Sequence, residues 1–437
     1  MIINFSVQNF HSIKDKVTLS FEATVAKDLE GYYIIEPKPG LRLLKLGLIY
    51  GANASGKTTI LMALDFLREM VLNPFEKKTD TFDFKPFLFD NHTPHENTFF
   101  SLEFLQKGVK YLYEIELNYE AIINEKLFFY SPNKAVVFER KTDLEKQLSI
   151  IDFGSKIKIN KEHKAILEAN TLSNNTVIGG FAKTNIESSE LRGVSDWFRN
   201  KLKQIIGPKT SLLNFVSNKL ENSIMDKKYI IEFLKKADFR ITDITIDKGE
   251  KEVDAKIIKF ISEKVSLSDE EINIIKEKSK TESKEIFFQH SIENGEIYKL
   301  PYKDESSGTQ RYYQFSGLLD LMIRNEMIIT IDELESSLHP DLLKHFLLTF
   351  LVNSKHSQLI ATTHYRELLM EKDILRNDAI WFTEKKEDGS TDLFSLTDFD
   401  SSVIRNTSSV YNAYKIGKLG AVPNLSDYYI DMEDGKE

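Results

Sequence analysis

The amino-acid sequence predicts an α/β protein with a mixed sheet, an antiparallel β lobe and a helical insertion. Three observations support this fold class. The apolar run LGLIY leads into the pattern GxxxxGKT at residues 51–58, and apolar residues at helical spacing follow up to residue 72. Stretches of alternating apolar residues fill 99–140. From about 150 to 285 the chain is rich in Lys and Glu, with apolar residues again at helical spacing.

These patterns divide the chain into three expected segments. Residues 1–150 form an N-terminal lobe with the glycine-rich loop and an antiparallel β subdomain, 151–285 form the helical insertion, and 286–437 form a C-terminal lobe with the remaining motifs. Apolar residues alternate over 3–7 and 17–21, which predicts two strands. We expect these two strands at the edge of the sheet that carries the glycine-rich loop.

Composition excludes several classes of protein. A chain of 437 residues, 41% of them hydrophobic, can build a large core. Because it has no cysteine, disulfides, thiolate zinc sites and cysteine nucleophiles are excluded. The start lacks a basic, apolar leader and no run of about 18 apolar residues follows, so a cytoplasmic protein without a membrane segment is expected. A formal charge of −9 disfavours a surface coated for non-specific nucleic-acid binding.

The GxxxxGKT pattern is typical of a phosphate-binding loop. Its glycines let backbone N–H groups turn toward phosphate oxygens at the N-terminus of a helix, where the dipole favours anions. By chance, this pattern alone occurs on the order of once in a hundred chains of this length. The requirement for a preceding strand and a following helix makes a chance match rarer still. Lys57 is expected to reach the β- and γ-phosphates and Thr58 to hold Mg²⁺. We expect nucleotide contacts from Gly51, Asn53, Ala54, Ser55, Gly56, Lys57, Thr58 and Thr59.

A second motif follows the apolar run Met327–Ile331, which ends in Asp332 and Glu333. An aspartate at the end of a buried strand can hold the water shell of Mg²⁺, and the next glutamate can polarise an attacking water. Two adjacent acids alone are usually solvated turn residues. The phosphate-binding loop and the apolar strand favour the catalytic interpretation, with Thr58 and Asp332 as metal ligands.

His364 ends another short apolar strand, QLIATT, one helix further along the chain. A lone histidine at a strand end is more often structural than catalytic. A right-handed crossover, however, puts this strand beside the one that ends at Asp332, with both ends at the same edge of the sheet. We therefore expect His364 to contact the γ-phosphate.

The stretch DESSGTQR at 304–311 stands just before a helical run. Ser/Gly/Thr clusters are usually helix caps. This one also combines a hydroxyl, a glycine that permits close backbone approach and a helix N-terminus, which together can bind an anion. Its place one helix before the Asp332 strand favours the anion-binding interpretation, with Ser307, Gly308 and Gln310 as contacts.

In this order the motifs resemble those of ATP-binding-cassette (ABC) ATPases, within the RecF, SMC and OLD branch. The resemblance implies ATP and Mg²⁺ as cofactors and Lys57, Glu333 and His364 as catalytic residues. It also implies that the serine-glycine signature of one protomer closes over ATP held by another, in a head-to-tail homodimer or a higher oligomer of dimers. The signature differs from the usual LSGGQ, with Ser306 for leucine and Thr309 for the second glycine.

Two further positions depart from the family pattern. No glutamine stands in 85–90, about where a Q-loop belongs, and His11 replaces an arginine found in many relatives. We therefore assign no Q-loop residue.

The motifs NFHSIKD, GANASGKT, PFLFD, ESSGTQR, IDELESSLHP, ATTHYREL and the tail 411–423 are together similar to those of the RloA/AbiL-type abortive-infection ATPases, and of the ATPase subunit of the PARIS anti-phage system. This resemblance implies a separately encoded effector, such as a TOPRIM-fold nuclease, and a phage-derived trigger. The helical insertion and the surface around 411–423 are the expected contact regions for these partners.

Two alternatives remain open at this stage. A RecF-like repair clamp would grip duplex DNA in an ATP-dependent, salt-sensitive way, although the acidic balance counts against it. An OLD-type nuclease within one chain would need a TOPRIM domain, and the roughly 70 residues after His364 are too few for one.

Overall fold

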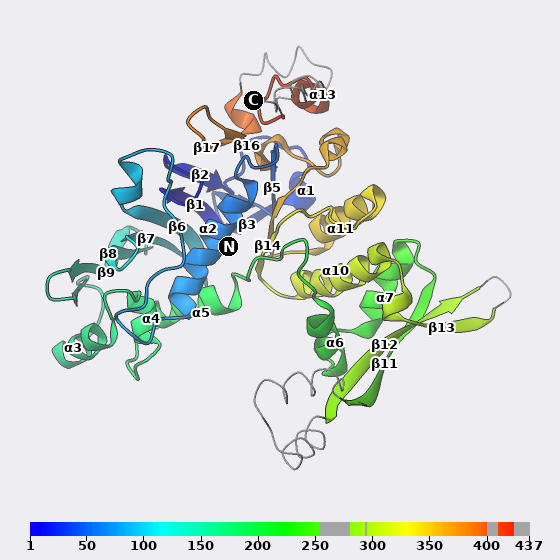
Figure 1. The fold of residues 1–437 in the computed structure, drawn as a ribbon, viewed down its shortest axis with the longest axis horizontal. Coiled ribbons are helices and arrows are strands. Elements are labelled where there is room, and N and C mark those ends of the chain that lie inside the picture. The colour runs from blue at the N-terminus through cyan, green and yellow to red at the C-terminus, as the bar shows by residue number, and fades with distance from the viewer. Residues whose placement is uncertain (253–279, 293–294, 400–409, 424–437) are drawn as a thin grey trace, which may run out of the picture. The chain divides into compact units, whose positions relative to one another are not determined.

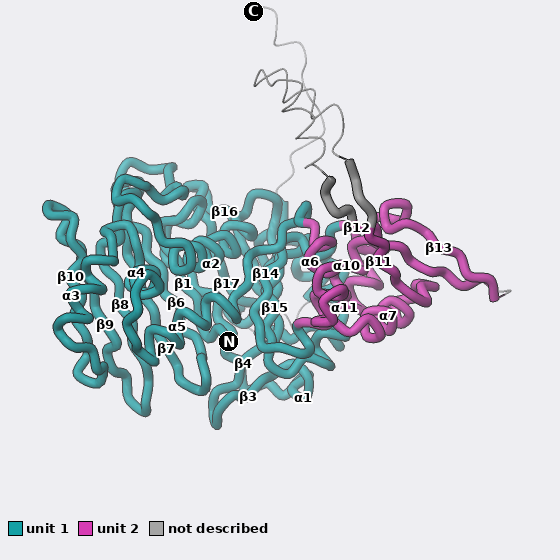
Figure 2. The backbone as a smooth tube through the Cα atoms, turned by 90° about the horizontal axis from the view of Figure 1, so that it is seen from below, with its two compact units in different colours: residues 1–210, 322–336, 347–437 teal, residues 211–321, 337–346 magenta. Residues whose placement is uncertain are grey.

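Figure 1 shows the computed structural model, which describes residues 1–252, 280–292, 295–399 and 410–423. The chain forms two compact units (Figure 2). Unit 1 comprises Met1–Thr210, Met322–Ser336 and Leu347–Glu437, and unit 2 comprises Ser211–Leu321 and Ser337–Phe346. The units divide the chain differently from the three segments expected from the sequence, because the first part of the expected insertion belongs to unit 1.

The central sheet of unit 1 has five strands in the order β14-β15-β5-β16-β17. All neighbours are parallel except β16 and β17, so the sheet is mixed, as predicted. Every residue of β5, β14 and β15 is buried, which is typical of parallel strands covered on both faces. The strands are β5 (Leu46–Gly51), β14 (Ile328–Ile331), β15 (Gln358–Thr362), β16 (Ile380–Lys385) and β17 (Thr391–Ser395).

The predicted antiparallel lobe is a seven-stranded sheet in the order β10-β9-β8-β7-β6-β1-β2. The expectation that the two N-terminal strands lie at the edge of the central sheet was wrong. They belong to this antiparallel sheet, because β1 pairs with β6 along almost its whole length and β2 pairs with β1. The strands are β1 (Ile2–Gln8), β2 (Val17–Ser20), β6 (Thr98–Gln106), β7 (Val109–Leu117), β8 (Ile122–Tyr130), β9 (Lys134–Asp143) and β10 (Leu148–Phe153).

Helices join the two sheets of unit 1. Helix α2 (Lys57–Leu72) contacts β1 of the antiparallel sheet and β5 and β15 of the central sheet, as well as α4 (Val177–Phe181) and α5 (Ser189–Asn200). The Ser188 hydroxyl caps α5, and Trp197 packs on the ring of Phe104 with 4.3 Å between centroids. Further elements of unit 1 are α1 (Glu30–Tyr33), β3 (Ile34–Lys38), β4 (Leu41–Leu44), α3 (Lys161–Asn170) and α13 (Val410–Lys415).

Unit 2 contains a three-stranded antiparallel sheet in the order β11-β12-β13, together with helices. Phe288 of the sheet packs against Tyr302 and Tyr313, with ring centroids 5.9 and 5.1 Å apart. The elements are α6 (Leu213–Glu221), α7 (Lys227–Lys236), β11 (Ile241–Glu252), β12 (Lys280–Ser291), β13 (Ile297–Pro301), most of α10 (Ser307–Arg324) and the first half of α11 (Pro340–Asn353).

Within the described ranges, we find no helix that is both long and apolar enough to span a membrane.

Candidate functional site

The predicted phosphate-binding loop connects β5 to α2, which begins at Lys57. Gly56 has φ of 100°, and a Cβ atom there would lie 2.1 Å from Oγ1 of Thr391. A Cβ atom on Gly51 would lie 2.6 Å from the carbonyl oxygen of Thr383. Both glycines are therefore required by the fold of the loop itself.

The ammonium group of Lys57 lies inside this loop. Its Nζ donates to the carbonyl oxygens of Gly51 and Ala52 at 2.9 and 2.8 Å, and the side chain is buried. Burial lowers its pKa to about 8, while Asp332 and other nearby carboxylates oppose this shift. Since two of its three N–H donors are held by the loop, the third can meet a phosphate oxygen.

Thr58 and Asp332, 274 positions apart in the chain, are brought together by the fold. Thr58 Oγ1 donates to both carboxylate oxygens of Asp332, at 3.0 and 3.1 Å. A hydroxyl and a carboxylate side by side are suitable ligands for Mg²⁺, which keeps waters and phosphate oxygens in its other positions. The described residues contain no group of three or more His, Asp or Glu side chains that could hold a metal. Waters and phosphate oxygens would therefore have to complete the coordination of Mg²⁺.

Thr362 at the end of β15 connects the two adjacent acids. Its hydroxyl donates to Asp332 Oδ1 at 2.6 Å and accepts the backbone N–H of Glu333 at 2.8 Å. Glu333 has φ of 49°, an uncommon left-handed conformation for a residue with a side chain. Thr362 was not predicted as a site residue, although two threonines at the end of an apolar strand are a usable signal.

His364 follows β15, which is a parallel neighbour of β14, the strand before Asp332. Its backbone N–H donates to Oε1 of Glu335 at 2.6 Å. Partial burial of its ring lowers the pKa of His364, with a further contribution from Lys57, so the imidazole is neutral near pH 7.

Glu335 was not predicted as a site residue. Among the described residues its second oxygen, Oε2, is buried without a hydrogen-bond partner. The signal in the sequence was a third acid in the run DELE.

The other predicted contacts of the loop fall into two groups. Asn53 and Ala54 are exposed on its outer turn. The hydroxyl of Ser55 instead pairs with Thr383 Oγ1 at 2.6 Å, and that of Thr59 accepts a hydrogen bond from Ser12 at 3.2 Å. Their side chains fasten the loop to its surroundings, which leaves the backbone N–H groups as the groups to meet phosphate.

The signature residues lie in unit 2, at the start of α10. The Ser306 hydroxyl accepts the backbone N–H of Thr309 at 3.1 Å, so Ser306 caps this helix. Ser307 is exposed. The amide nitrogen of Gln310 donates to the carbonyl oxygens of the preceding turn at 3.0–3.4 Å, from Tyr302, Lys303 and Glu305.

The tail segment 411–423 is largely packed against its own unit. The ring of Tyr414 stacks on Phe382 of β16 at 5.3 Å, and its hydroxyl donates to the carbonyl of Ala421 at 3.1 Å. Among the large apolar side chains of 411–423, Ile416 is exposed, at 62%. The apolar residues of this motif are thus mainly explained by packing.

This arrangement of a loop, a helix and acids around the central strands of the mixed sheet defines a P-loop nucleotide-binding protein. The chain belongs to the family described as "AAA domain, putative AbiEii toxin, Type IV TA system", which matches residues 48–371. No curated protein matches the chain significantly.

Several solved structures are similar to the chain. The SMC head domain from Thermotoga maritima has 13% identity and a TM-score of 0.40, with 90% of this chain and 98% of that chain covered. An SMC head bound to the C-winged helix domain of ScpA has 14% identity and a TM-score of 0.41, with coverages of 91% and 99%. A head domain with an extended coiled coil, bound to the C-terminal domain of ScpA derived from Pyrococcus furiosus, has 14% identity and a TM-score of 0.33, with coverages of 96% and 98%.

Proposed function

We propose that this protein binds and hydrolyses ATP in a head-to-tail homodimer, or a higher oligomer of such dimers, and thereby controls a separately encoded effector of an anti-phage defence system. The observation that carries the ATPase part is the network of Thr58, Asp332 and Thr362, with distances of 2.6–3.1 Å, at the same edge of the sheet as the phosphate-binding loop.

Each residue of the site has a proposed task. Lys57 and the backbone of the loop bind the β- and γ-phosphates of ATP, while Thr58 and Asp332 hold Mg²⁺. When bound, Mg²⁺ neutralises charge on the phosphate oxygens. Glu333 orients the attacking water and the neutral imidazole of His364 contacts the γ-phosphate. Most of the rate then comes from positioning and charge neutralisation.

The proposed dimer is supported by the environment of Gly308. A glycine in the first turn of a helix costs about 0.5–1 kcal/mol relative to alanine. A Cβ atom at Gly308 would meet nothing closer than the carbonyl of Ser337 at 3.5 Å, which is an ordinary contact. The fold of unit 2 therefore gives no steric reason for a glycine here. Close approach by a nucleotide bound to another protomer, beside the exposed Ser307, would supply one.

The first test is the native mass of Glu333→Gln, expressed from its own operon, with and without ATP. This variant should bind ATP without cleaving it and accumulate as the closed dimer. A second polypeptide in that assembly would support an effector-controlling ATPase, whose link to toxin systems rests on the description of its family. If no neighbouring gene product binds and phage protection does not depend on Lys57, the defence proposal fails.

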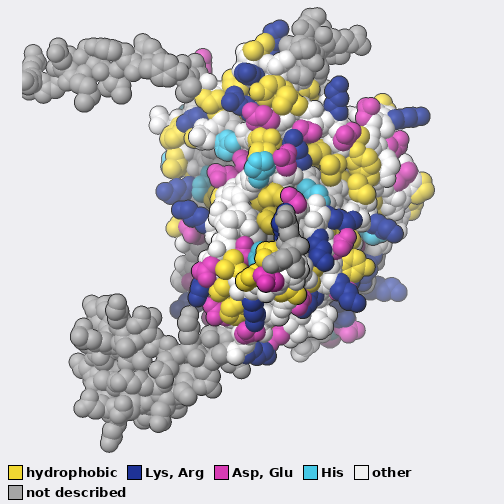
Figure 3. Space-filling model, turned by 90° about the vertical axis from the view of Figure 1, so that its right-hand side faces the viewer, with side chains coloured by type: hydrophobic (Ala, Val, Ile, Leu, Met, Phe, Trp, Pro, Cys, Tyr) yellow, Lys and Arg dark blue, Asp and Glu magenta, His cyan; other side chains and the backbone are white. Residues whose placement is uncertain are grey.

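The runner-up is an ATP-driven clamp on duplex DNA. The net charge of −9 disfavours it, and basic and acidic side chains are interspersed on the face shown in Figure 3. A bare Glu333→Gln dimer that captures duplex DNA only with ATP would favour the clamp.

A further inference from the structure

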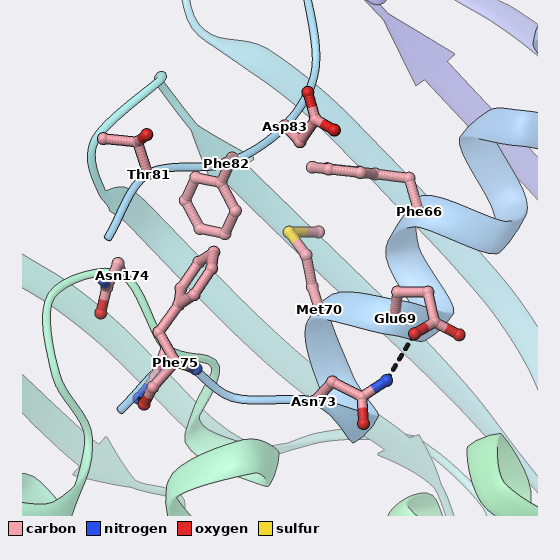
Figure 4. Close-up of a pocket in the computed structure, with 10 residues that line it drawn as sticks. Phe66, Glu69, Met70, Asn73, Phe75, Thr81, Phe82, Asp83 and Asn174 are labelled. Atoms are coloured by element: carbon pink, nitrogen blue, oxygen red, sulfur yellow. Dashed lines mark hydrogen bonds between the residues drawn. The ribbon is translucent and has the colours of Figure 1, made fainter. Parts of the chain in front are cut away.

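A cavity of about 230 Å³ lies in unit 1 beside the C-terminal end of α2 (Figure 4). Phe66 and Met70 of this helix form one part of its wall, and Phe75 and Phe82, from the segment after the helix, form another. Phe82 makes edge contacts with both other rings, at 6.1 Å to Phe66 and 5.3 Å to Phe75. The helix that begins at the phosphate-binding loop thus lines a second, separate site with its last turns.

Hydrogen bonds hold the wall of this cavity in place. Asn175 binds the backbone of Phe75 twice, accepting its N–H at 2.7 Å and donating to its carbonyl at 3.0 Å. Asn174 donates through Nδ2 to the carbonyls of Lys77 and Asp80, at 2.9 and 2.8 Å. These bonds tie the segment after α2 to the turn at 174–175. The cavity is therefore formed before any ligand enters.

Of the polar side chains that line this cavity, Thr81 and Asp83 are exposed and Asn174 is buried. Asn174 is 1% exposed, and its Oδ1 has no hydrogen-bond partner in the part of the chain that the structure describes. The exposed Asp83 adds a carboxylate at the rim. The carboxylate of Glu69 also lines the cavity, but Arg68 and the amide of Asn73 already bind it. The carboxylates of Asp83 and Glu69 therefore disfavour an anionic ligand.

We propose that this cavity binds a guanidinium or amidinium cation on a short apolar or aromatic stem. Three aromatic rings attract a cation to their faces, and the flexible thioether of Met70 adapts to a stem of varied shape. Asp83 supplies the counter-charge. Such a group comes either from a free organic cation or from an arginine side chain of a partner protein.

Three probes of one shape and different charge test this proposal on the full chain. Benzamidinium should bind in calorimetry, benzamide should bind about tenfold more weakly because it lacks the charge, and benzoate should not bind. Equal affinities for benzamidinium and benzamide, or binding of benzoate alone, would overturn the proposal. So would a lack of benzamidinium binding at millimolar concentrations.

A variant at an exposed position avoids the risk of misfolding. Asp83→Asn should weaken benzamidinium binding about tenfold, whereas Glu120→Gln, an exposed acid outside this cavity, should leave it unchanged. The same loss in both variants would show that overall charge, and not this site, attracts the probe.

Two further ligands distinguish the sources of the cation. Agmatine carries a free alkylguanidinium, and the capped peptide Ac-Ala-Arg-Ala-NH₂ presents the same group on a backbone. Binding of agmatine alone supports a free organic cation, and binding of the peptide supports an arginine on a partner. Binding of neither would overturn the guanidinium assignment.

Discussion

The backbone N–H of His364 donates a 2.6 Å hydrogen bond to the carboxylate of Glu335, 29 residues earlier in the chain. This bond ties the segment after β15 to the loop that contains Asp332 and Glu333, directly after β14. The proposed γ-phosphate contact and the proposed water-orienting acid are thus held in one local arrangement. Neither Glu335 nor Thr362 was predicted from the sequence as a site residue.

Glu335→Ala should lower the turnover number of the ATPase about tenfold and change KM less than twofold. The reason is that His364 loses its positioning partner while the phosphate-binding loop is untouched. Glu335→Gln keeps an acceptor oxygen and should recover most of the rate. Steady-state ATP hydrolysis measures both constants, and an unchanged turnover number in Glu335→Ala would contradict the positioning role.

Thr362→Val removes the donor to Asp332 and leaves the backbone N–H of Glu333 without its acceptor. Because these groups are buried or partly buried, we expect a loss of about 1–3 kcal/mol in the free energy of unfolding, together with slower hydrolysis. Urea denaturation and an ATPase assay measure the two effects.

The matched control is Thr330→Val in β14. The hydroxyl of Thr330 is equally buried but has no hydrogen-bond partner among the described residues. Its replacement by a methyl group should therefore be neutral or slightly stabilising. If both variants lose the same stability, the Thr362 hydrogen bonds are not the cause.

Two glycine substitutions distinguish a glycine that the fold of one chain requires from a glycine that dimerisation requires. Gly56→Ala should disrupt the phosphate-binding loop, since its Cβ atom would clash with Thr391 at a left-handed φ.

Gly308→Ala should keep or raise the stability of the monomer by up to about 1 kcal/mol, because alanine favours a helix. It should nevertheless abolish ATP-dependent dimerisation, which light scattering detects. Full dimerisation of Gly308→Ala would remove the main support for a signature that closes over the nucleotide of another protomer.

Lys45 predicts a pH dependence of stability. Its buried ammonium donates to the carbonyls of Leu351 and Ser354 at the C-terminal end of α11, and burial lowers its pKa from 10.5 to about 8. The cost of burying the charge is fully present below pH 8 and disappears as the pH rises from 8 to 10.5.

Wild type should therefore gain about 1–2 kcal/mol relative to Lys45→Met between pH 7 and pH 9.5. Urea unfolding of the two proteins at both values gives this difference, and the comparison cancels the titration of other groups. A difference that does not change with pH would show that Lys45 has an ordinary pKa in the folded chain.

The sequence by itself was sufficient for features that depend on local backbone geometry. The strand, loop and helix around Gly51 and Lys57 follow from apolar spacing and two glycines within some twenty residues. The adjacency of β14 and β15 follows from the handedness of a crossover, which applies to any such unit. The antiparallel lobe was predicted from the alternation of apolar residues in 99–140, which is also a local pattern.

Tertiary structure decided everything that depends on which residues meet across elements. The two N-terminal strands alternate in a way that suits either sheet, and only pairing with β6 assigns β1 to the antiparallel one. The partners of Thr362, Glu335 and Lys45 cannot be predicted from local patterns, because each residue meets its partner through strand register or helix packing over 29 or more residues. Burial then shifts the pKa values of Lys45 and Lys57, since desolvation arises only when distant segments close around a charge.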